Sequence, residues 1–255
     1  MDWTPQEDQH CELTTLVVDL RNSSEFFRQS ELLAADERER ARDHVREFVR
    51  ELSVVTHNAV IAWSNQRNDE VRIVKFTGDG FMILLAAPDG ASGSPLGPSR
   101  AVAIASTIRR EMRGICDRWD KLRVKRVSAG DVGTVSSVVH GTVRYGKVAI
   151  PAVDGHDALG EPVVKAFRFA QLRAFGPSDG NSDLLILCTE TERQVRALLT
   201  DASADDHQQQ LASRIRRLTF AKVLPSDLPD GKAGKGVHDP TLWVHVWEDG
   251  TIPRN

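Results

Sequence analysis

The chain has 255 residues, of which 40% are hydrophobic and 27% charged, so it can fill the core of one large domain and does not have the composition of a disordered protein. The 33 Lys and Arg against 36 Asp and Glu give a net charge of −3, which argues against a nucleic-acid-binding protein with a basic surface. No apolar run approaches the length of a membrane span, so we expect no membrane partner. The acidic N-terminus lacks the apolar segment of a secretory signal, and three scattered cysteines fit a reducing compartment, so we expect a cytoplasmic protein.

Hydrophobic periodicity predicts strands and helices that alternate along the chain. In chain order, we expect a strand at 13–20, a helix at 41–55, strands at 71–76 and 81–87, a helix at 101–115, strands at 124–139 and 141–151, a helix at 158–174, a strand at 184–188, a helix at 191–199, and strands at 218–224 and 241–247. The polar segment 201–210 is expected to be a loop. This order predicts an α+β fold, a ferredoxin-like split βαββαβ sandwich with extra C-terminal strands. We expect a single domain over residues 1–255, with a core from about 13 to 247.

Two aspartates stand where catalytic carboxylates could meet. Asp19 lies at the end of the first predicted strand, and Asp79 lies at the tip of the central hairpin, between two glycines expected to supply positive φ. If these strands are neighbours, the two carboxylates converge. They could then hold two divalent ions about 3.5–4 Å apart, as two-metal phosphoryl-transfer sites require, and oxygen ligands suit Mg²⁺ or Mn²⁺. The alternative interpretation is that each aspartate is only a turn or cap residue.

A serine-rich segment follows the first aspartate. Residues 20–26 would place backbone N–H groups at a helix N-terminus, where phosphates bind well. Ser23 and Ser24 are therefore candidate substrate-binding residues. Bound phosphates could also complete the coordination of a metal ion.

Three sequence blocks resemble, in the right order, the motifs of class III nucleotidyl cyclases. LVVDLRNSSEFF resembles their opening strand and metal loop, and KFTGDGFM resembles their central hairpin, in which a Lys precedes the second metal-binding Asp by four residues. DALGEPVVKAFR, residues 157–168, resembles their third motif, which runs from an Asp through Gly to Asn, Ala and Arg. The blocks span most of the chain, and the resemblance implies a sandwich of the class III cyclase type.

The resemblance implies a two-metal reaction. Asp19 and Asp79 would bind two Mn²⁺ or Mg²⁺ ions, and the backbone carbonyl of Leu20 would complete one coordination sphere. One ion would lower the pKa of the ribose 3′-hydroxyl, and the other would hold the triphosphate. The 3′-oxygen would then attack the α-phosphorus in line, and pyrophosphate would leave.

The same resemblance assigns residues to the nucleotide. Arg168 would stabilise charge on the transferring phosphoryl group, since its planar fork suits phosphate oxygens. Lys75 and Asp157 would face the base, and a late lysine, Lys222 rather than Lys235, would reach the triphosphate. Each residue also has a structural alternative: Lys75 could be a solvated strand residue, Arg168 a surface ion-pair partner and Asp157 a helix N-cap.

Val164 departs from the family pattern. Four residues before the motif's Arg, these cyclases usually carry an Asn that orients the ribose, and its absence puts ribose positioning in question. In such cyclases the metal pair comes from one subunit, and the base-facing residues and the Arg come from its partner. A chain with both sets therefore implies a homodimer with two shared sites, in which Lys75 and Asp79 of one hairpin serve different sites.

The opening VVDLRN, the small size and the lack of a recognisable sensor domain resemble the Pycsar pyrimidine cyclases of bacterial antiphage defence. That resemblance implies UTP as substrate and cUMP as product, sensed by a separate cyclic-nucleotide effector. The base contacts leave CTP and ATP open, because Lys75 as donor and Asp157 as acceptor match the edges of all three bases. The alternatives are an adenylate cyclase that makes cAMP and a nucleotide-binding pseudoenzyme. A diguanylate cyclase is disfavoured because the hairpin lacks the GG[DE]EF motif.

Overall fold

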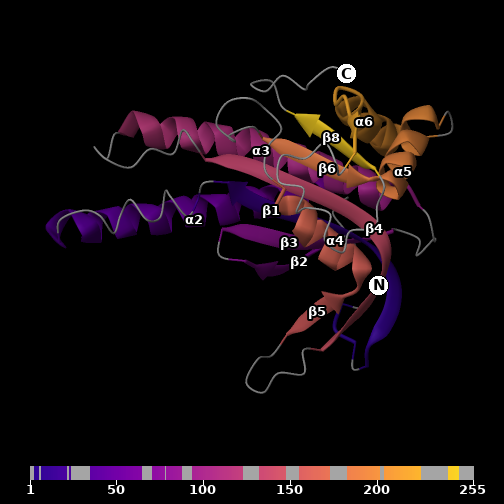
Figure 1. Cartoon of the computed structure of the whole chain (residues 1–255), viewed down its shortest axis with the longest axis horizontal. Coiled ribbons are helices and arrows are strands. Elements are labelled where there is room, and N and C mark those ends of the chain that lie inside the picture. The colour runs from indigo at the N-terminus through magenta and orange to yellow at the C-terminus, as the bar shows by residue number, and fades with distance from the viewer. Residues whose placement is uncertain are drawn as a thin grey trace.

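The computed structural model describes residues 3–5, 7–21, 23, 35–64, 71–77, 79–87, 94–122, 132–147, 155–172, 183–201, 204–224 and 241–246. The helices and strands within these ranges are labelled in Figure 1. They are β1 (Gln9–Arg21), α2 (Ala35–Trp63), β2 (Val71–Phe76), β3 (Gly80–Ala86), α3 (Leu96–Leu122), β4 (Gly133–Lys147), β5 (His156–Leu159), α4 (Glu161–Ala170), β6 (Leu184–Cys188), α5 (Thr189–Thr200), α6 (Asp206–Ile215), β7 (Ala221–Val223) and β8 (Leu242–Val246). No helix in the described ranges has the combination of length and hydropathy that a membrane span requires.

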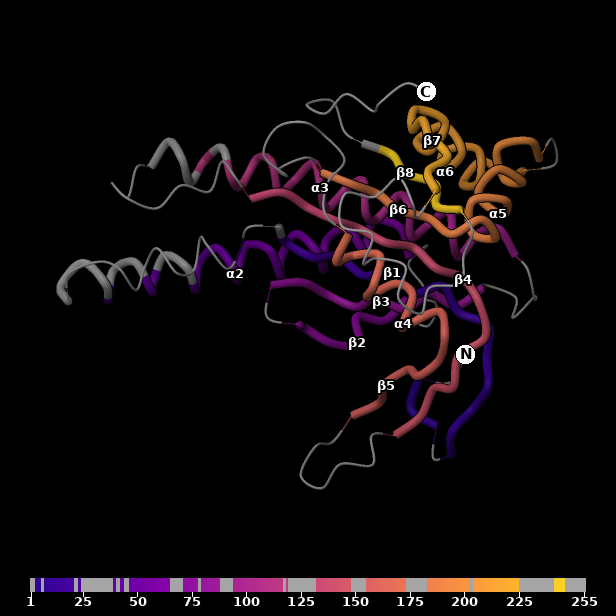
Figure 2. Tube along the Cα trace, viewed as in Figure 1, coloured from indigo at the N-terminus to yellow at the C-terminus, as the bar shows by residue number. Residues whose placement is uncertain are grey.

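One sheet contains these strands in the order β2-β3-β1-β4-β6-β8-β7, with β5 paired to the end of β4. Strands β4 and β6 run parallel, and the other neighbouring pairs are antiparallel. Figure 2 shows β2 and the late strands β8 and β7 on opposite sides of the central β1 and β4. The arrangement confirms the predicted α+β sandwich with extra C-terminal strands.

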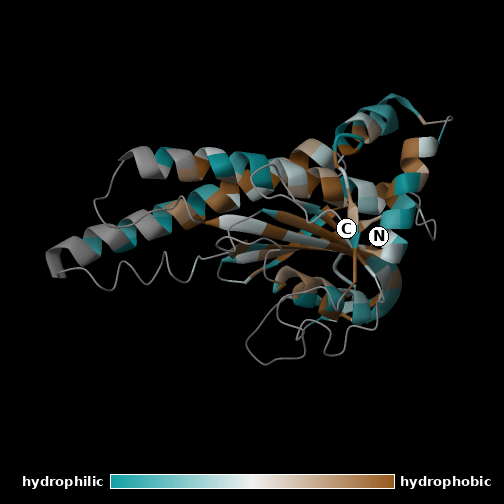
Figure 3. Ribbon diagram, turned by 45° about the horizontal axis from the view of Figure 1, so that its top comes forward, coloured by the Kyte–Doolittle hydropathy of each residue, from teal (hydrophilic) through white to brown (hydrophobic). Residues whose placement is uncertain are grey.

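Side-chain alternation along β1 divides the core into two layers. Leu16 and Val18 belong to one apolar cluster, which α2, α3, α5 and α6 cover. Val17 belongs to the cluster on the opposite face, together with Val163 and Phe169 of α4. Figure 3 shows the hydrophobic residues gathered on the sheet and on the helix faces turned toward it. Helices thus pack on both faces of the sheet.

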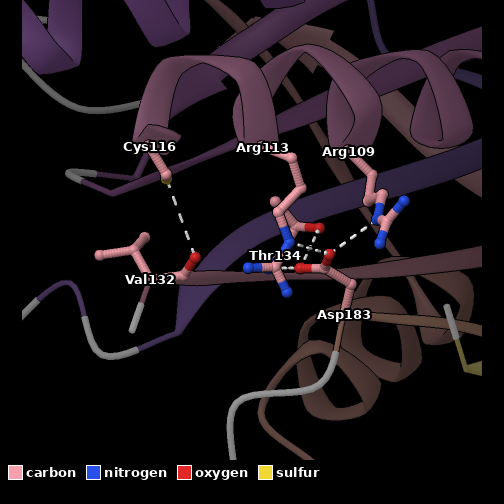
Figure 4. Close-up of polar contacts among 6 residues, drawn as sticks. All are labelled: Arg109, Arg113, Cys116, Val132, Thr134 and Asp183. Atoms are coloured by element: carbon pink, nitrogen blue, oxygen red, sulfur yellow. Dashed lines mark hydrogen bonds and ion pairs between the residues drawn. The ribbon is translucent and has the colours of Figure 1, made fainter. Parts of the chain in front are cut away.

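A buried carboxylate joins α3 to the central strands (Figure 4). Asp183, which is 1% exposed, accepts hydrogen bonds from Arg109 Nε at 2.7 Å and from Arg113 Nε at 2.8 Å. It also accepts from the backbone N–H of Thr134 at 2.7 Å, at the start of β4. Because a buried charge is tolerated only when it is paired and hydrogen-bonded, this cluster has the structural role of fixing α3 on the sheet.

The predicted pair of strands at 124–139 and 141–151 is wrong for the described residues. A single strand, β4, runs from Gly133 to Lys147 through the expected turn position, Gly141. Gly141 lies opposite Leu13 in the β1–β4 ladder. A Cβ on this glycine would come within 2.8 Å of Pro162 Cγ in α4. The glycine at position 141 is therefore required by the close packing of α4 and does not form a turn.

The helix predicted at 158–174 begins later. Residues 156–159 form β5, and α4 starts at Glu161 after Gly160, whose φ of 149° favours glycine. Asp157 therefore lies in a strand, and its interpretation as a helix N-cap is wrong. The end of the predicted segment, 173–174, lies outside the described residues.

The polar segment 201–210 also differs from its prediction. Its second half belongs to α6, which begins at Asp206. Asp205 is the N-cap: its side chain accepts a hydrogen bond from the backbone of Gln208, and the Gln208 side chain bonds back to the N-cap backbone. This capping box explains a helix start that contains no apolar residue, since the buried positions of α6 come only at Leu211 and beyond.

Candidate active site

The two predicted metal-binding aspartates lie together at one end of the sheet. The antiparallel pairing of β1 with β3 places Asp19 opposite Gly80, directly beside Asp79. The backbone N–H of Leu20 donates a hydrogen bond to the backbone carbonyl of Asp79 at 3.2 Å. The predicted convergence of the strand end and the hairpin tip is thus present in the structure.

Gly80 permits this close approach. A Cβ at this position would lie 2.2 Å from the backbone oxygen of Val18 and 3.1 Å from Cα of Asp19. Gly80 does not have a positive φ, so the expectation that it supplies one is wrong; Gly78 lies outside the described residues. The glycine is needed because the hairpin tip packs directly against the backbone of β1.

Ser23 contacts the same group of oxygens. It is 2% exposed, and its hydroxyl lies 3.0 Å from the backbone oxygen of Leu20 and 2.5 Å from Asp79 Oδ2. Its nearest partners are therefore protein oxygens and not a solvent-facing phosphate position. Ser24, the other predicted phosphate ligand, lies outside the described residues.

The donor set at this end fits a hard divalent cation. It consists of the carboxylates of Asp19 and Asp79 and the carbonyl of Leu20, all oxygen donors of the kind that Mg²⁺ and Mn²⁺ accept. In the described part of the chain no group of three or more His, Cys, Asp and Glu side chains forms a fuller metal site. The remaining coordination positions would fall to water and to phosphate oxygens, as is usual for Mg²⁺.

Lys75, the last residue but one of β2, meets Asp157 of β5 close to the same hairpin tip. Lys75 Nζ lies 2.8 Å from Asp157 Oδ2, and the two side chains are 39% and 29% exposed. Asp157 Oδ1 accepts a hydrogen bond from the backbone N–H of Ala158 at 2.8 Å. The predicted pair is therefore assembled within one chain, and Lys75 is not simply a solvated strand residue.

An aromatic ring borders this pair. The ammonium group of Lys75 lies 5.6 Å from the ring centroid of Phe167 on α4, within the range of a cation–π contact. Phe167 was not among the predicted site residues, because an aromatic residue on an amphipathic helix is normally assigned to the core. Its position directly before the motif's Arg168 was the available signal.

Arg168 and Val164 lie one turn apart on α4, and Val164 is 48% exposed. Arg168 is partly exposed, and it has no carboxylate partner among the described residues, so a surface ion pair does not account for it. Its guanidinium is available to an anionic ligand.

Lys222 is not brought near these groups within one chain. It lies on β7 at the sheet edge opposite β2, paired with Trp243 and separated from β1 by β4, β6 and β8. Lys235 lies outside the described residues.

Solved structures with the same architecture are cyclase domains. The adenylyl cyclase CyaB from P. aeruginosa superposes with a TM-score of 0.61 at 16% identity, covering 95% of this chain and 96% of its own. The guanylyl cyclase Cya2 gives 0.57 at 18% identity, covering 97% and 96%. The catalytic core of a rhodopsin-guanylyl cyclase with converted specificity, in complex with ATPalphaS, gives 0.59 at 14% identity, covering 94% and 98%. The chain has the class III nucleotidyl cyclase fold.

No protein-family model matches the sequence and no curated protein does, so among the comparisons with known proteins only the solved structures show a likeness. In the cyclase fold of this chain the paired aspartates occupy the β1–β3 junction, and the Lys75–Asp157 pair joins β2 to β5. The fold therefore places both groups near the tip of one hairpin, one where β3 meets β1 and the other where β2 meets β5.

An N-terminal strap (residues 3–5) supports the second group. The backbone oxygen of Trp3 accepts hydrogen bonds from Arg72 of β2 and, at 3.1 Å, from Tyr145 Oη of β4. The ring of His156, next to Asp157 in β5, donates from Nε2 to the backbone oxygen of Pro5 at 3.1 Å. The strap thus ties together the strands that carry the Lys75–Asp157 pair. No periodic pattern in the sequence predicts this strap.

Proposed function

We propose that this chain is a nucleotidyl cyclase that converts a nucleoside triphosphate into its 3′,5′-cyclic monophosphate and pyrophosphate. The observation that carries the proposal is the juxtaposition of Asp19 and Asp79 across the β1–β3 ladder, within a fold shared with adenylyl and guanylyl cyclase domains. The all-oxygen donor set supports two Mn²⁺ or Mg²⁺ ions. These ions, when bound, would lower the pKa of the ribose 3′-hydroxyl and neutralise the triphosphate.

The chain's own residues would bind and orient the reactants. Asp19, Asp79 and the Leu20 carbonyl would hold the ions, and the partly exposed Arg168 would donate to the oxygens of the transferring phosphoryl group. In the reaction, a bond forms between the ribose 3′-oxygen and the α-phosphorus, and the bond from that phosphorus to the pyrophosphate oxygen breaks. The hydroxyl proton leaves to solvent.

The active unit in this proposal is a homodimer with two composite sites. Within one chain the strand spacing places Lys222 on the far side of the sheet from Asp19, so one chain does not gather every proposed contact. Three large apolar residues near the Lys75–Asp157 pair are also well exposed, which suits a subunit contact: Phe76 at 47%, Leu159 at 67% and Val164 at 48%.

Mixing two inactive variants tests the composite site. Asp79→Ala and Arg168→Ala chains should each form dead homodimers, while their mixture should regain activity through one working site per heterodimer. A mixture that stays inactive after demonstrated subunit exchange contradicts the shared-site proposal.

UTP is the proposed substrate, ahead of CTP and ATP. A Lys75 N–H can donate to uracil O4 while Asp157 accepts from N3–H, and the 2.8 Å contact places this donor and acceptor side by side. The same pair matches the edges of cytosine and adenine, so the stronger support is the resemblance of the opening motif to pyrimidine cyclases. Phe167 beside Lys75 adds a ring that limits the space open to a larger base.

A competition assay tests both the activity and the base. The protein is incubated with equimolar ATP, GTP, CTP and UTP and Mn²⁺, and products are identified by mass spectrometry. We expect cUMP as the main product. Cyclic AMP as the main product would favour the adenylate cyclase, and no cyclic product with retained nucleotide binding would favour the pseudoenzyme.

A role in antiviral defence, with the product sensed by a separate effector in the cytoplasm, completes the proposal. It is supported by the Pycsar-like opening motif only. A neighbouring gene for a cyclic-nucleotide-binding effector, and loss of phage protection on Asp79→Ala substitution, are the expected observations. If the Asp79→Ala variant still protects against phage, cyclic nucleotide synthesis is not required for the protection.

A further inference from the structure

The side chain of Ser23 is buried against two oxygens of the proposed metal site. Its hydroxyl lies 2.5 Å from Asp79 Oδ2 and 3.0 Å from the backbone oxygen of Leu20, and the residue is 2% exposed. Ser23 follows the end of β1 by two residues, and its hydroxyl contacts the backbone oxygen of Leu20, the last residue but one of that strand.

A hydroxyl carries one hydrogen, so Ser23 donates to one of these oxygens at a time. Both acceptors belong to groups that the proposed function assigns to metal coordination, the Asp79 carboxylate and the Leu20 carbonyl. No described group donates to the other carboxylate oxygen, Asp79 Oδ1. A hydrogen bond from Ser23 to Oδ2 therefore orients the Asp79 carboxylate. Oδ1 is then the carboxylate oxygen without a protein donor among the described residues.

A direct phosphate contact would require the hydroxyl to face the solvent-accessible side of the site. The 2% exposure and the two protein acceptors are inconsistent with that orientation. Outer groups that hydrogen-bond to a metal ligand typically change metal affinity or activity by about 10–100-fold when they are removed.

We propose that Ser23 is a positioning residue for the metal ions: its hydroxyl orients the Asp79 carboxylate, with the Leu20 carbonyl as its alternative acceptor, and it does not bind the nucleotide phosphates. This inference rests on the proposed function, because it concerns the metal site of that activity. It assigns Ser23 a different role from the phosphate ligand that the sequence predicts.

Metal affinity is the readout that separates these roles. Binding of Mn²⁺ alone, without nucleotide, is measured by EPR for the wild type, Ser23→Ala and Ser23→Thr, and the Mn²⁺ dependence of turnover is measured in parallel. Ser23→Ala should weaken Mn²⁺ binding by about 10-fold or more. Ser23→Thr retains the hydroxyl and should recover most of the affinity. Ser23→Cys, close in size with a weaker donor, provides a second reading if the alanine variant does not fold.

Ser99→Ala is the matched control. Ser99 is a fully buried serine in α3, and its hydroxyl has no hydrogen-bond partner among the described residues. Its substitution should leave Mn²⁺ affinity and turnover at wild-type values. A fall in both variants alike would indicate a general effect of losing a buried hydroxyl and would overturn the proposal.

Two further outcomes contradict the inference in distinguishable ways. Unchanged Mn²⁺ affinity in Ser23→Ala with a raised KM for the nucleotide would restore the phosphate-binding role, and the proposed function would stand. A wild-type protein that binds no more Mn²⁺ than Asp79→Asn would instead count against the metal site itself, and with it against the proposed function.

Discussion

The two ends of the proposed composite site, a metal end and a base end, are built in opposite ways. The metal end (Asp19, Asp79 and the Leu20 carbonyl) is set by backbone: a strand ladder, an N–H to carbonyl bond at 3.2 Å and a glycine that leaves no room for a Cβ. The base end (Lys75 and Asp157) is set by side chains that are 82 residues apart in sequence and meet in a half-exposed ion pair.

This difference separates the proposed tasks of metal binding and base selection into two kinds of structure. Backbone contacts at the metal end hold the ligands in one arrangement, as preorganised catalysis requires. The partly exposed ion pair at the base end contributes little stability, because solvent screens it. Lys75 and Asp157 can therefore give up their contact with each other and bind a base at a small cost in free energy. Substitutions at the two ends should therefore have separable effects.

The largest effect is expected from Asp79→Asn. Loss of one carboxylate removes a metal ligand and should lower kcat by about 10³-fold or more, since the metal contributes several kcal/mol to transition-state stabilisation. The melting temperature should stay the same or rise, because the partly exposed carboxylates of Asp19 and Asp79 repel one another without metal. Turnover by mass spectrometry and thermal unfolding check the two parts.

Asp183→Asn should give the opposite result in the same assays, a lower melting temperature with turnover retained. It breaks the buried cluster with Arg109 and Arg113 (Figure 4), and leaving those charges unpaired should cost about 3–5 kcal/mol of stability. Turnover should persist at temperatures below the lowered melting point.

Normal cyclisation by Asp79→Asn would refute the assignment of the metal end.

Gly80→Ala should damage the metal end through the backbone. The added Cβ meets the Val18 oxygen at 2.2 Å, and overpacking of this kind costs about 1–3 kcal/mol. The hairpin tip must move away from Asp19, so we expect weaker Mn²⁺ binding as well as a lower free energy of unfolding. Gly155→Ala is the control, because a Cβ there meets nothing within 4 Å. Equal behaviour of the two variants would contradict a backbone-set metal end.

The structure explains why the sequence predicted the metal end better than the base end. A strand ending in Asp19 and a hairpin tip bearing Asp79 are local patterns, and antiparallel pairing of the two strands follows from the fold class. Asp157 was identified only through the resemblance, because β5 is a four-residue strand without hydrophobic alternation. Its contact with Lys75 depends on how β5 folds back beside β2, a long-range arrangement that no local pattern encodes.

The same reasoning accounts for the errors in the fold. Glycine is common in turns, so Gly141 predicted one, but in the structure its lack of a side chain allows Pro162 to pack closely against it. The start of α6 is specified by the capping hydrogen bonds of Asp205 and Gln208, which hydrophobic periodicity does not detect. Local sequence rules predicted the type of an element where its buried residues recur with the period of a helix or a strand. They failed where one residue is required by a packing contact or by a capping hydrogen bond.

Lys75→Ala should change selection more than chemistry. Removing the ammonium leaves the base without one donor, at a cost of about 1–3 kcal/mol, which corresponds to roughly 5–150-fold in KM or in the preference among nucleotides. Mn²⁺ affinity should stay at the wild-type value, because Lys75 does not contact the metal end. Lys147→Ala, an exposed lysine at the end of β4, should leave both quantities unchanged. A loss of Mn²⁺ affinity in Lys75→Ala would show that the two ends are coupled.

The smallest effect is expected from Val164→Asn, which restores the side chain that class III cyclases usually carry there. Val164 is 48% exposed on α4, so the substitution leaves no core cavity and should change the free energy of unfolding by no more than about 0.5 kcal/mol. If the ribose lies over this turn of α4, next to Arg168, the amide adds one hydrogen bond and kcat/KM should rise by about two- to tenfold. The gain should appear with every nucleotide alike, because the ribose is common to them, and it should leave both the Mn²⁺ dependence and the preference among bases unchanged. Steady-state kinetics with UTP, CTP and ATP provide the measurement, and Val54→Asn on α2, at 52% exposure, is the matched substitution remote from α4. A fall in kcat/KM would mean that Val164 serves an apolar contact, such as the subunit interface, and that this chain positions the ribose by other residues.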